Sequence, residues 1–372
     1  MIISRTPFRV SFFGGGSDYP DWYREHGGAV LAGSIDRFCY LSCRWFPNYF
    51  DARYRIVYSR IELAREIEAI EHPSVRACLR HMGIHEGVEI VHNADLPARS
   101  GLGSSSAFTV GLLNCLHALR GLDPDQQSLA ELAIHLEQNV MCENVGSQDQ
   151  MTVAHGGLNH VTFTADGCVA RPIAISARRL AELESHFLLV WTGLSRNASD
   201  IAQHQIRNIP DKRAELKTMQ AFVDMAVDIL AGGGDIADFG RLMHESWKLK
   251  RTLSSHITTP LVDDAYAAAR RAGALGGKLL GAGGGGFLLI MARPEDHASV
   301  RGALSDFLWT NLKFESDGSQ IIFNSAHAPT ARGAATQSLP QDQWAETECP
   351  EPLPSLSRGA RGTLDRSWFP PS

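Results

Sequence analysis

The chain has 372 residues, a formal net charge of −6 and 44% hydrophobic residues, which suits one large domain or two of middle size. The lack of a basic excess argues against nucleic acid as a partner, and no run reaches the ~18 apolar residues of a membrane span. The seven cysteines are odd in number and form no CxxC pair, which argues against a disulfide framework. We therefore expect a cytoplasmic protein with no nucleic-acid or membrane partner.

The first half of the chain alternates between extended and helical apolar patterns. At the N-terminus, Arg5, Pro7 and Arg9 interrupt the apolar run, which predicts a strand instead of a signal peptide. Further on, Ser128 followed by Glu131 forms a capping box that predicts the start of a helix. In chain order, the patterns predict strands over 1–13 and 28–46, a helix over 61–83, a strand over 87–97, and helices over 105–121 and 128–143.

The second half predicts a further unit and then a different kind of segment. A strand pattern over 156–163 is followed by a buried-strand run over 186–196, helices over 212–230 and 236–253, and a glycine loop that leads into a strand by residue 292. We place a domain boundary near residue 180, which gives an N-terminal domain over 1–180 and a C-terminal domain over 181–328. Residues 329–372 are rich in proline and show no apolar period, which predicts a disordered tail.

The stretch PARSGLGSSSAF, Pro97–Phe108, places two glycines and four serines between a strand pattern and a helix pattern. A strand, a Gly/Ser loop and a helix together form an arrangement that binds phosphate. The first helical turn leaves backbone N–H groups unpaired at the positive end of the helix dipole. No Gly-Lys-Ser/Thr follows the glycines, so this is not a Walker loop. From this stretch alone, two interpretations remain: a loop that binds phosphate and a glycine-rich loop that binds no ligand.

Three further features favour a phosphate-handling site. Near the N-terminus, Arg9 and Asp18 flank the glycine turn of RVSFFGGGSDY. The segment GSQDQ carries Asp149 among small polar residues, downstream of Glu137. A third glycine-rich loop lies in the stretch KLLGAGGGGFLLI, residues 278–290, and leads into a strand. Glycine clusters of this kind mark places where the backbone turns tightly or approaches a ligand closely.

These three motifs resemble, in order and spacing, those of the GHMP small-molecule kinases, over about residues 1–325. The segments FFGGGSDYP, VGSQDQ and TGLSRNAS most resemble the corresponding segments of the D-glycero-D-manno-heptose 7-phosphate kinases. The resemblance implies an α+β, two-lobed GHMP kinase fold with a ribosomal-protein-S5-like N-terminal lobe and a ferredoxin-like C-terminal lobe. ATP and Mg²⁺ would be the cofactors.

The resemblance also implies roles for individual residues. Asp149 would be the catalytic aspartate that takes or orients the proton of the attacking hydroxyl, and Arg9 would lie beside it. Ser105 and Glu137 would hold Mg²⁺, with Ser104 in reserve. The ATP phosphates would lie over the loop formed by Pro97, Arg99, Gly101, Leu102, Gly103, Ser104, Ser105 and Ser106.

The substrate side follows from the same resemblance. Asp18 matches an aspartate that binds sugar hydroxyls in galactokinase-like members, whereas Gly15 and Gly16 stand where galactokinases carry Glu and His. This departure argues for a larger or differently oriented sugar. Arg196 is the first candidate for binding a phosphate on the sugar, because Arg matches phosphate oxygens bidentately, and Lys248 and Arg251 compete with it. The expected substrate-binding set is Gly15, Gly16, Ser17, Asp18, Arg196, Gly283 and Gly284.

The leading hypothesis is an ATP-dependent kinase for the anomeric hydroxyl of a heptose 7-phosphate, a small-molecule sugar phosphate. Its product would serve nucleotide-activated heptose for surface polysaccharide. A fucokinase-like kinase acting on an unphosphorylated sugar stays open, as does a non-catalytic sensor on the same fold. A homodimer also stays open, because nothing in the sequence decides the oligomeric state.

Overall fold

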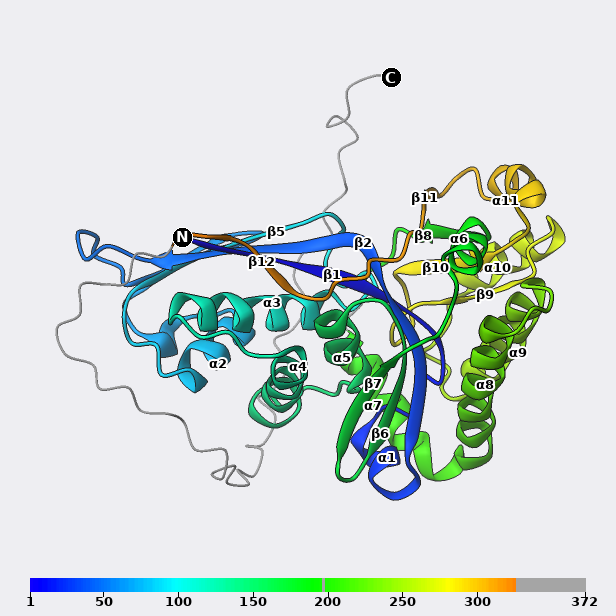
Figure 1. The fold of residues 1–372 in the computed structure, drawn as a ribbon, viewed down its shortest axis with the longest axis horizontal. Coiled ribbons are helices and arrows are strands. Elements are labelled where there is room, and N and C mark those ends of the chain that lie inside the picture. The colour runs from blue at the N-terminus through cyan, green and yellow to red at the C-terminus, as the bar shows by residue number, and fades with distance from the viewer. Residues whose placement is uncertain (196–197, 326–372) are drawn as a thin grey trace. The chain divides into compact units, whose positions relative to one another are not determined.

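The computed structural model describes residues 1–195 and 198–325, which form two β-sheets with helices packed against them (Figure 1). The predicted α+β class is therefore confirmed. The substrate candidate Arg196 and the predicted tail, 329–372, lie outside the described residues. The domain limits at 180 and 328 stay a prediction.

The first sheet has eight strands. Its central strand is β2 (Gly28–Trp45), which pairs with three neighbouring strands. Residues 28–33 pair with β6, residues 39–45 pair with β5, and β1 runs antiparallel along both parts. The strand order is β12-β1-β2-β5-β3-β4, with β6 on β2 and β7 on β6. The other strands are β1 (Ile2–Phe13), β3 (Tyr54–Val57), β4 (Ile61–Ala64), β5 (Val88–Ala94), β6 (Leu158–Thr164), β7 (Gly167–Pro172) and β12 (Gln320–Asn324).

The second sheet is antiparallel and has the strand order β11-β8-β10-β9. Helix α9 (Ala237–Thr252) packs on β9, and α8 (Arg213–Ala231) packs on α9 and also on β1 and β2. The strands are β8 (Phe187–Trp191), β9 (Gly276–Leu279), β10 (Phe287–Met291) and β11 (Leu308–Asn311). The remaining helices in this half of the chain are α6 (Ala177–Ser185), α7 (Ala198–Asn208), α10 (Pro260–Arg271) and α11 (His297–Ala303).

Helices lie along one side of the long strands β1, β2 and β5 (Figure 1). They are α2 (Pro73–His81), α3 (Ser104–Leu119), α4 (Gln126–His135) and α5 (Gln148–His155), while α1 (Pro20–His26) follows β1. Helix α3 packs on both β1 and β2, and most of its residues are buried. The phosphate-loop candidate at its N-terminus is therefore anchored to the centre of the first sheet.

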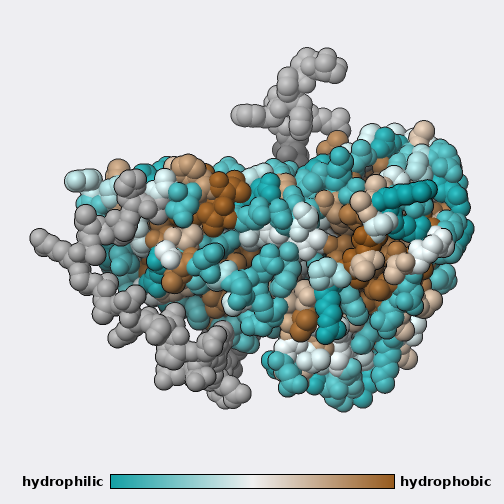
Figure 2. Space-filling model, in the orientation of Figure 1, coloured by the Kyte–Doolittle hydropathy of each residue, from teal (hydrophilic) through white to brown (hydrophobic). Residues whose placement is uncertain are grey.

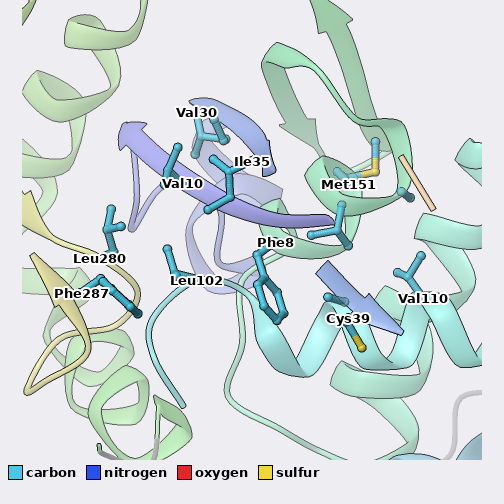
Figure 3. Close-up of a cluster of buried hydrophobic side chains, with 14 of the residues drawn as sticks. Phe8, Val10, Val30, Ile35, Cys39, Leu102, Val110, Met151, Leu280 and Phe287 are labelled. Carbon is cyan, nitrogen blue, oxygen red and sulfur yellow. The ribbon is translucent and has the colours of Figure 1, made fainter. Parts of the chain in front are cut away.

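A shared apolar core joins the two sheets. Phe12 of β1 packs against Phe187 of β8 and Phe239 of α9, with ring centroids 5.3 and 5.6 Å apart. Close to the site, Leu102, Leu280 and Phe287 lie together in the buried cluster of Figure 3. Burial of such side chains is worth about 1.5–3 kcal/mol each, so the loops that carry Leu102 and Leu280 are held in place by the core.

Two sequence expectations need correction. Residues 61–64 are a strand, β4, with alternating exposed and buried side chains, and the helix expected there begins only at Pro73. Helix α4 begins at Gln126 because Asp125 Oδ1 accepts the backbone N–H of Ser128 at 2.7 Å, so Ser128 is not the cap. The last three residues of GSQDQ open helix α5, for which the sequence analysis made no prediction.

The surface facing the viewer in Figure 2 is mostly hydrophilic, with apolar areas between the polar ones. Within residues 1–195 and 198–325, no helix is both long and apolar enough to cross a membrane. Cys39 and Cys43 are buried along β2 as free thiols, and the described residues contain no cluster of three or more candidate metal-binding His, Cys, Asp or Glu side chains.

Candidate active site

The loop before helix α3 presents backbone N–H groups to a cavity. Helix α3 begins at Ser104, directly after Gly103, whose φ of +72° lies in the left-handed region. No side chain of the described residues caps this N-terminus. The first-turn N–H groups therefore stay available for an anion, with the positive end of the helix dipole behind them.

The third glycine-rich loop fixes the phosphate loop from the other side. A Cβ added at Gly101, where φ is +81°, would lie 2.5 Å from the carbonyl oxygen of Leu280, so this position requires glycine. The N–H of Phe287 donates to the carbonyl oxygen of Ser100 at 2.9 Å. Two motifs that are far apart in the sequence thus contact each other backbone to backbone.

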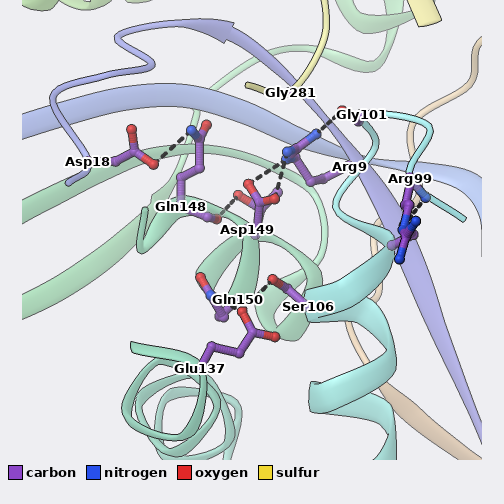
Figure 4. A network of polar contacts seen from close by, with 12 residues as sticks. Arg9, Asp18, Arg99, Gly101, Ser106, Glu137, Gln148, Asp149, Gln150 and Gly281 are labelled. Carbon is purple, nitrogen blue, oxygen red and sulfur yellow. Dashed lines mark hydrogen bonds and ion pairs between the residues drawn. The ribbon is translucent and has the colours of Figure 1, made fainter. Parts of the chain in front are cut away.

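Arg9 and Asp149 form a bidentate ion pair beside the loop (Figure 4). Arg9 Nε and Nη2 donate to the two carboxylate oxygens at 2.7 and 2.6 Å, and Nη1 donates to the Gly101 carbonyl at 2.7 Å. A Cβ at Gly103 would lie 3.4 Å from Asp149 Oδ2. The prediction that Arg9 lies beside Asp149 is confirmed, and the pair lies against the phosphate loop.

Three consecutive side chains at the start of α5 each hold a different group. Gln148 Nε2 donates to Asp18 Oδ2 at 2.8 Å, Asp149 accepts from Arg9, and Gln150 Nε2 donates to Glu137 (Figure 4). Successive residues of a helix point about 100° apart, so one turn reaches three directions. The sequence analysis missed Gln148 and Gln150. The GSQDQ motif could have indicated both residues, because Gln148 and Gln150 flank Asp149 and all three lie in the first turn of a helix.

Asp18 is buried, with an exposed fraction of 2%. Its Oδ1 accepts the backbone N–H of Gly16 at 2.9 Å, and burial raises the pKa of its carboxyl. Gly15, Gly16 and Asp18 all line the cavity. Ser17 does not: its hydroxyl lies 2.8 and 2.9 Å from the carbonyl oxygens of Gly14 and Ala29, shares its one proton between them, and accepts the N–H of Ala29 at 3.1 Å. It therefore holds the turn in place and does not face a substrate.

Glu137 is fully buried in the π-helical segment Leu136–Val140. Ser106 Oγ donates to Glu137 Oε2 at 2.9 Å, while Oε1 has no hydrogen-bond partner among the described residues. Burial raises the pKa of Glu137 to about 7. Ser105, the predicted partner, is exposed on the cavity wall. The structure therefore brings Ser106 to Glu137 in place of Ser105, because residue 106 is the one on the buried face of α3.

The two predicted glycines of the third loop lie against the turn after α9. A Cβ at Gly283, where φ is +125°, would lie 2.6 Å from Ile257 Cα, and the N–H of Gly284 donates to the Ile257 carbonyl at 2.9 Å. Gly283 lines the cavity. Both glycines shape the wall by close backbone packing.

The cation that reaches the cavity from α9 is Lys250, which the sequence analysis missed. Lys248 is exposed and pairs with Glu245 at 2.9 Å, and Arg251 pairs with Asp263 at 3.2 Å, so neither candidate lines the cavity. Lys250 lines it and is 5% exposed. The signal was helical spacing, because Lys250 lies three residues after buried Trp247, on the apolar face of the helix.

An aromatic group lines another part of the same cavity. The ring of His72 stacks on Phe108 of α3 with centroids 4.6 Å apart and planes at 19°, and Tyr58 meets His72 edge-on at 5.0 Å. Burial lowers the pKa of His72 to about 4, so this imidazole is neutral at physiological pH. A flat, uncharged surface of this kind suits a planar aromatic ligand.

The phosphate loop, the Arg9–Asp149 pair, Asp18, Lys250 and the aromatic group line one cavity of about 1020 Å³, whereas Glu137 and Gln150 lie outside its lining. This volume lies at the upper end of the roughly 300–1,000 Å³ typical of ligand sites, which is large enough for a ligand of nucleotide size. Of the predicted loop residues, Arg99 lines the cavity in the left-handed conformation, with φ of 59°, and its N–H donates to Ser104 Oγ at 3.2 Å. Leu102 is a buried anchor, and Pro97 is exposed outside the cavity wall.

Two domain models match the chain: the GHMP kinases N terminal domain over residues 61–157 and the GHMP kinases C terminal domain over residues 225–308. These matches agree with the phosphate loop and with the aspartate beside it, and together they indicate which class of protein this is. The chain carries both domains of the GHMP kinases, which are ATP-dependent phosphotransferases.

Its relatives within that class include kinases of sugars. The D-glycero-alpha-D-manno-heptose 7-phosphate kinase of Campylobacter jejuni is 24% identical over 330 residues, which cover 83% of this chain and 96% of the relative. The bifunctional fucokinase/GDP-fucose pyrophosphorylase of Arabidopsis thaliana is 27% identical over 320 residues, 78% of this chain and 30% of that longer protein. The solved D-glycero-D-manno-heptose 1-phosphate kinase from Bacteroides thetaiotaomicron has the same fold, with a TM-score of 0.65, 23% identity, and coverage of 87% of this chain and 99% of that chain.

Proposed function

We propose that this kinase transfers the γ-phosphoryl group of ATP to the anomeric hydroxyl of D-glycero-D-manno-heptose 7-phosphate. The observation that carries the proposal is the Asp149 carboxylate, held at both oxygens by Arg9 and lying against Gly103 of the phosphate loop. A carboxylate at this place is within reach of a hydroxyl that attacks a phosphate bound on the loop.

In the proposed reaction, the acceptor oxygen forms a bond to the γ-phosphorus while the bond to the β,γ-bridging oxygen breaks and ADP leaves. The proton of the acceptor hydroxyl passes to Asp149. The bidentate contact with Arg9 keeps both carboxylate oxygens oriented. Positioning of this kind, with electrostatic stabilisation, carries most of the catalysis in phosphoryl transfer.

The nucleotide would occupy the loop and the aromatic group. The phosphates lie over the N-terminus of α3, and the base contacts the flat surface formed by His72 and Phe108. Phe108 is on α3, one turn beyond Ser104, so the same helix would bind both ends of the nucleotide. Arg99, at the rim of the loop, adds a cation for the phosphates.

The residues present fit a magnesium ion. Mg²⁺ prefers hard oxygen ligands, and Glu137 Oε1 is a buried acceptor without a partner among the described residues, which a cation would satisfy. Glu137 and a loop serine, Ser105 or Ser106, would hold the ion. When bound, it neutralises charge on the phosphates.

The acceptor would lie on the Asp18 side of Asp149. Gln148 donates a hydrogen bond to one oxygen of Asp18, and the Gly16 N–H donates to the other. The carboxylate is therefore held in one orientation, in which it would accept hydrogen bonds from sugar hydroxyls. Gly15 and Gly16 add no side chains to this wall, which leaves room for a larger sugar than a hexose. The similarity to the heptose 7-phosphate kinase supports the same substrate.

A fucokinase-like activity on an unphosphorylated sugar is the second candidate, favoured by the fucokinase relatives. The deciding experiment is ATP turnover across a panel of heptoses, hexoses, fucose and their phosphates. Our proposal predicts the highest kcat/KM with the heptose 7-phosphate. A preference for an unphosphorylated sugar would establish the second candidate, and no turnover with any sugar would contradict both.

A further inference from the structure

Lys250 is a buried cation that the catalytic scheme above does not use. It comes from α9, in the second half of the chain, and lines the cavity with an exposed fraction of 5%. Its Nζ donates to the carbonyl oxygen of Gly281 at 2.6 Å. An ammonium group has three donors, and among the described residues the Lys250 ammonium makes no other hydrogen bond and no ion pair. Two donors are therefore left for a ligand.

A second buried lysine, Lys278, shows that burial of a lysine does not by itself place its ammonium group at the cavity. Lys278 of β9 is 2% exposed, and its Nζ donates to the Phe12 carbonyl at 3.1 Å. Lys278 does not line the cavity, so its ammonium links the two sheets. Lys250 is similarly buried and also has a single protein acceptor, but it lines the cavity and can therefore meet a ligand.

The position of Lys250 relative to the loops indicates which ligand atoms it meets. Gly281, its acceptor, packs on the phosphate loop so closely that a Cβ there would lie 2.8 Å from Gly101 Cα. The carbonyl oxygen of Gly101 accepts Arg9 Nη1 at 2.7 Å. Arg9 and Lys250 thus flank the same pair of glycines, one from each half of the chain, and Arg9 also holds Asp149.

We propose that Lys250 is a second catalytic cation, whose ammonium group donates to the phosphoryl group that moves from ATP to the acceptor. The proposal rests on the proposed kinase reaction and adds a residue to it. Arg9 and Lys250 together would neutralise the charge that spreads over the equatorial oxygens in the transition state. The lowered pKa of Lys250, about 8 because of burial and the nearby Arg9, agrees with a cation that gains its counter-charge only when phosphate binds.

The test compares three variants on one helix. Lys250→Met removes the charge and the donor, Lys250→Gln keeps an amide donor for Gly281 without the charge, and Lys248→Met is the matched control at an exposed position. For each we would measure kcat, the KM for ATP, the KM for the sugar, and ATP binding by calorimetry. Thermal unfolding and the binding signal show whether each variant is folded.

We expect both Lys250 variants to lose roughly 10²–10³-fold in kcat, the range for removal of one transition-state donor. ATP affinity should change by less than about threefold, and Lys248→Met should match the wild type. The loss should be equal with phosphorylated and unphosphorylated acceptors, because the ammonium contacts the transferred group. If Lys250→Met does not fold, Lys250→Gln alone decides the question.

Two results would overturn the proposal. Near-wild-type kcat in Lys250→Gln would mean that the ammonium only holds Gly281. A loss confined to the KM of a phosphorylated sugar would mean that Lys250 binds the acceptor's own phosphate. Failure of the substrate proposal looks different: the wild type would prefer another acceptor, and the effect of Lys250 on kcat would still be measurable with that acceptor.

Discussion

Helices α5 and α9 both supply side chains to the cavity, but they do so in different ways. The first turn of α5 directs three consecutive residues, Gln148, Asp149 and Gln150, at Asp18, Arg9 and Glu137. Helix α9 passes beside the cavity and contributes Lys250, while Lys248 and Arg251 pair with acids elsewhere. A helix that begins at a site supplies a contiguous motif, and a helix that passes a site supplies one residue per turn.

The largest effect should come from the middle residue of the α5 turn. Asp149→Asn removes the proton acceptor, and a positioned base typically contributes 10²–10⁴-fold. We expect a loss of kcat in that range with ATP affinity preserved, measured by ADP release and by calorimetry. Asp166→Asn, in the exposed turn between β6 and β7, is the control. Near-wild-type kcat in Asp149→Asn would remove Asp149 from the mechanism.

The α9 contribution should appear in the pH dependence. The pKa of Lys250 is lowered to about 8, so in the free enzyme its amine is charged below that pH and neutral above it. The groups that act on it are Arg9, Asp18, Asp149 and Lys278. We expect kcat/KM to fall about tenfold per pH unit above pH 8.

The matched variant for this profile is Lys250→Arg, because a guanidinium stays charged throughout the accessible range. Its kcat/KM should lack the fall above pH 8, even if its maximum is lower than that of the wild type. An identical alkaline limb in both proteins would show that another group causes the fall.

The two glutamines of the α5 turn should separate two functions. Gln148→Leu removes a donor from Asp18 and should raise the KM for the sugar about tenfold, since a hydrogen bond to a charged group is worth about 1.5–3 kcal/mol. Gln150→Leu removes a donor from Glu137 and should instead raise the Mg²⁺ concentration needed for half-maximal activity. Each variant is the control of the other. Equal effects on both quantities would mean that the turn acts as one structural unit.

The smallest effects should come from the outward side of α9. Lys248→Met and Arg251→Met each break an exposed ion pair, worth about 0–1 kcal/mol. We expect kcat and both KM values to stay within about twofold, measured with the same acceptor panel. A selective rise in the KM of phosphorylated sugars in either variant would return that residue to the substrate site.

The contrast between the two helices also explains what the sequence could predict. The phosphate loop follows from one contiguous stretch of small residues that suits an anion, and strand β1, helix α3 and the long helices α8 and α9 follow from apolar periodicity. These features are local, so the sequence carries them directly. The Arg9–Asp149 pair joins segments far apart in the sequence, and only the resemblance to the GHMP kinases implied it.

The missed features depend on tertiary packing. Helical spacing from Trp247 indicates that Lys250 lies on the buried face of α9, but only the packing of the whole molecule shows that this face borders the cavity. The choice of Ser106 over Ser105 at Glu137 depends on how α3 is rotated against the first sheet. The short helix α5 and the strand β4 have weak local patterns, and neighbouring elements decide their structure.

The most direct test of the central claim is the ³¹P NMR spectrum of the wild-type reaction with ATP, Mg²⁺ and D-glycero-D-manno-heptose 7-phosphate. Phosphoryl transfer to the anomeric hydroxyl predicts a second sugar phosphorus signal, coupled to the C1 proton, that grows in step with ADP. The same mixture with Asp149→Asn should show almost none of it. A phosphate at another carbon, or ADP release with unphosphorylated sugars alone, would contradict the proposed function.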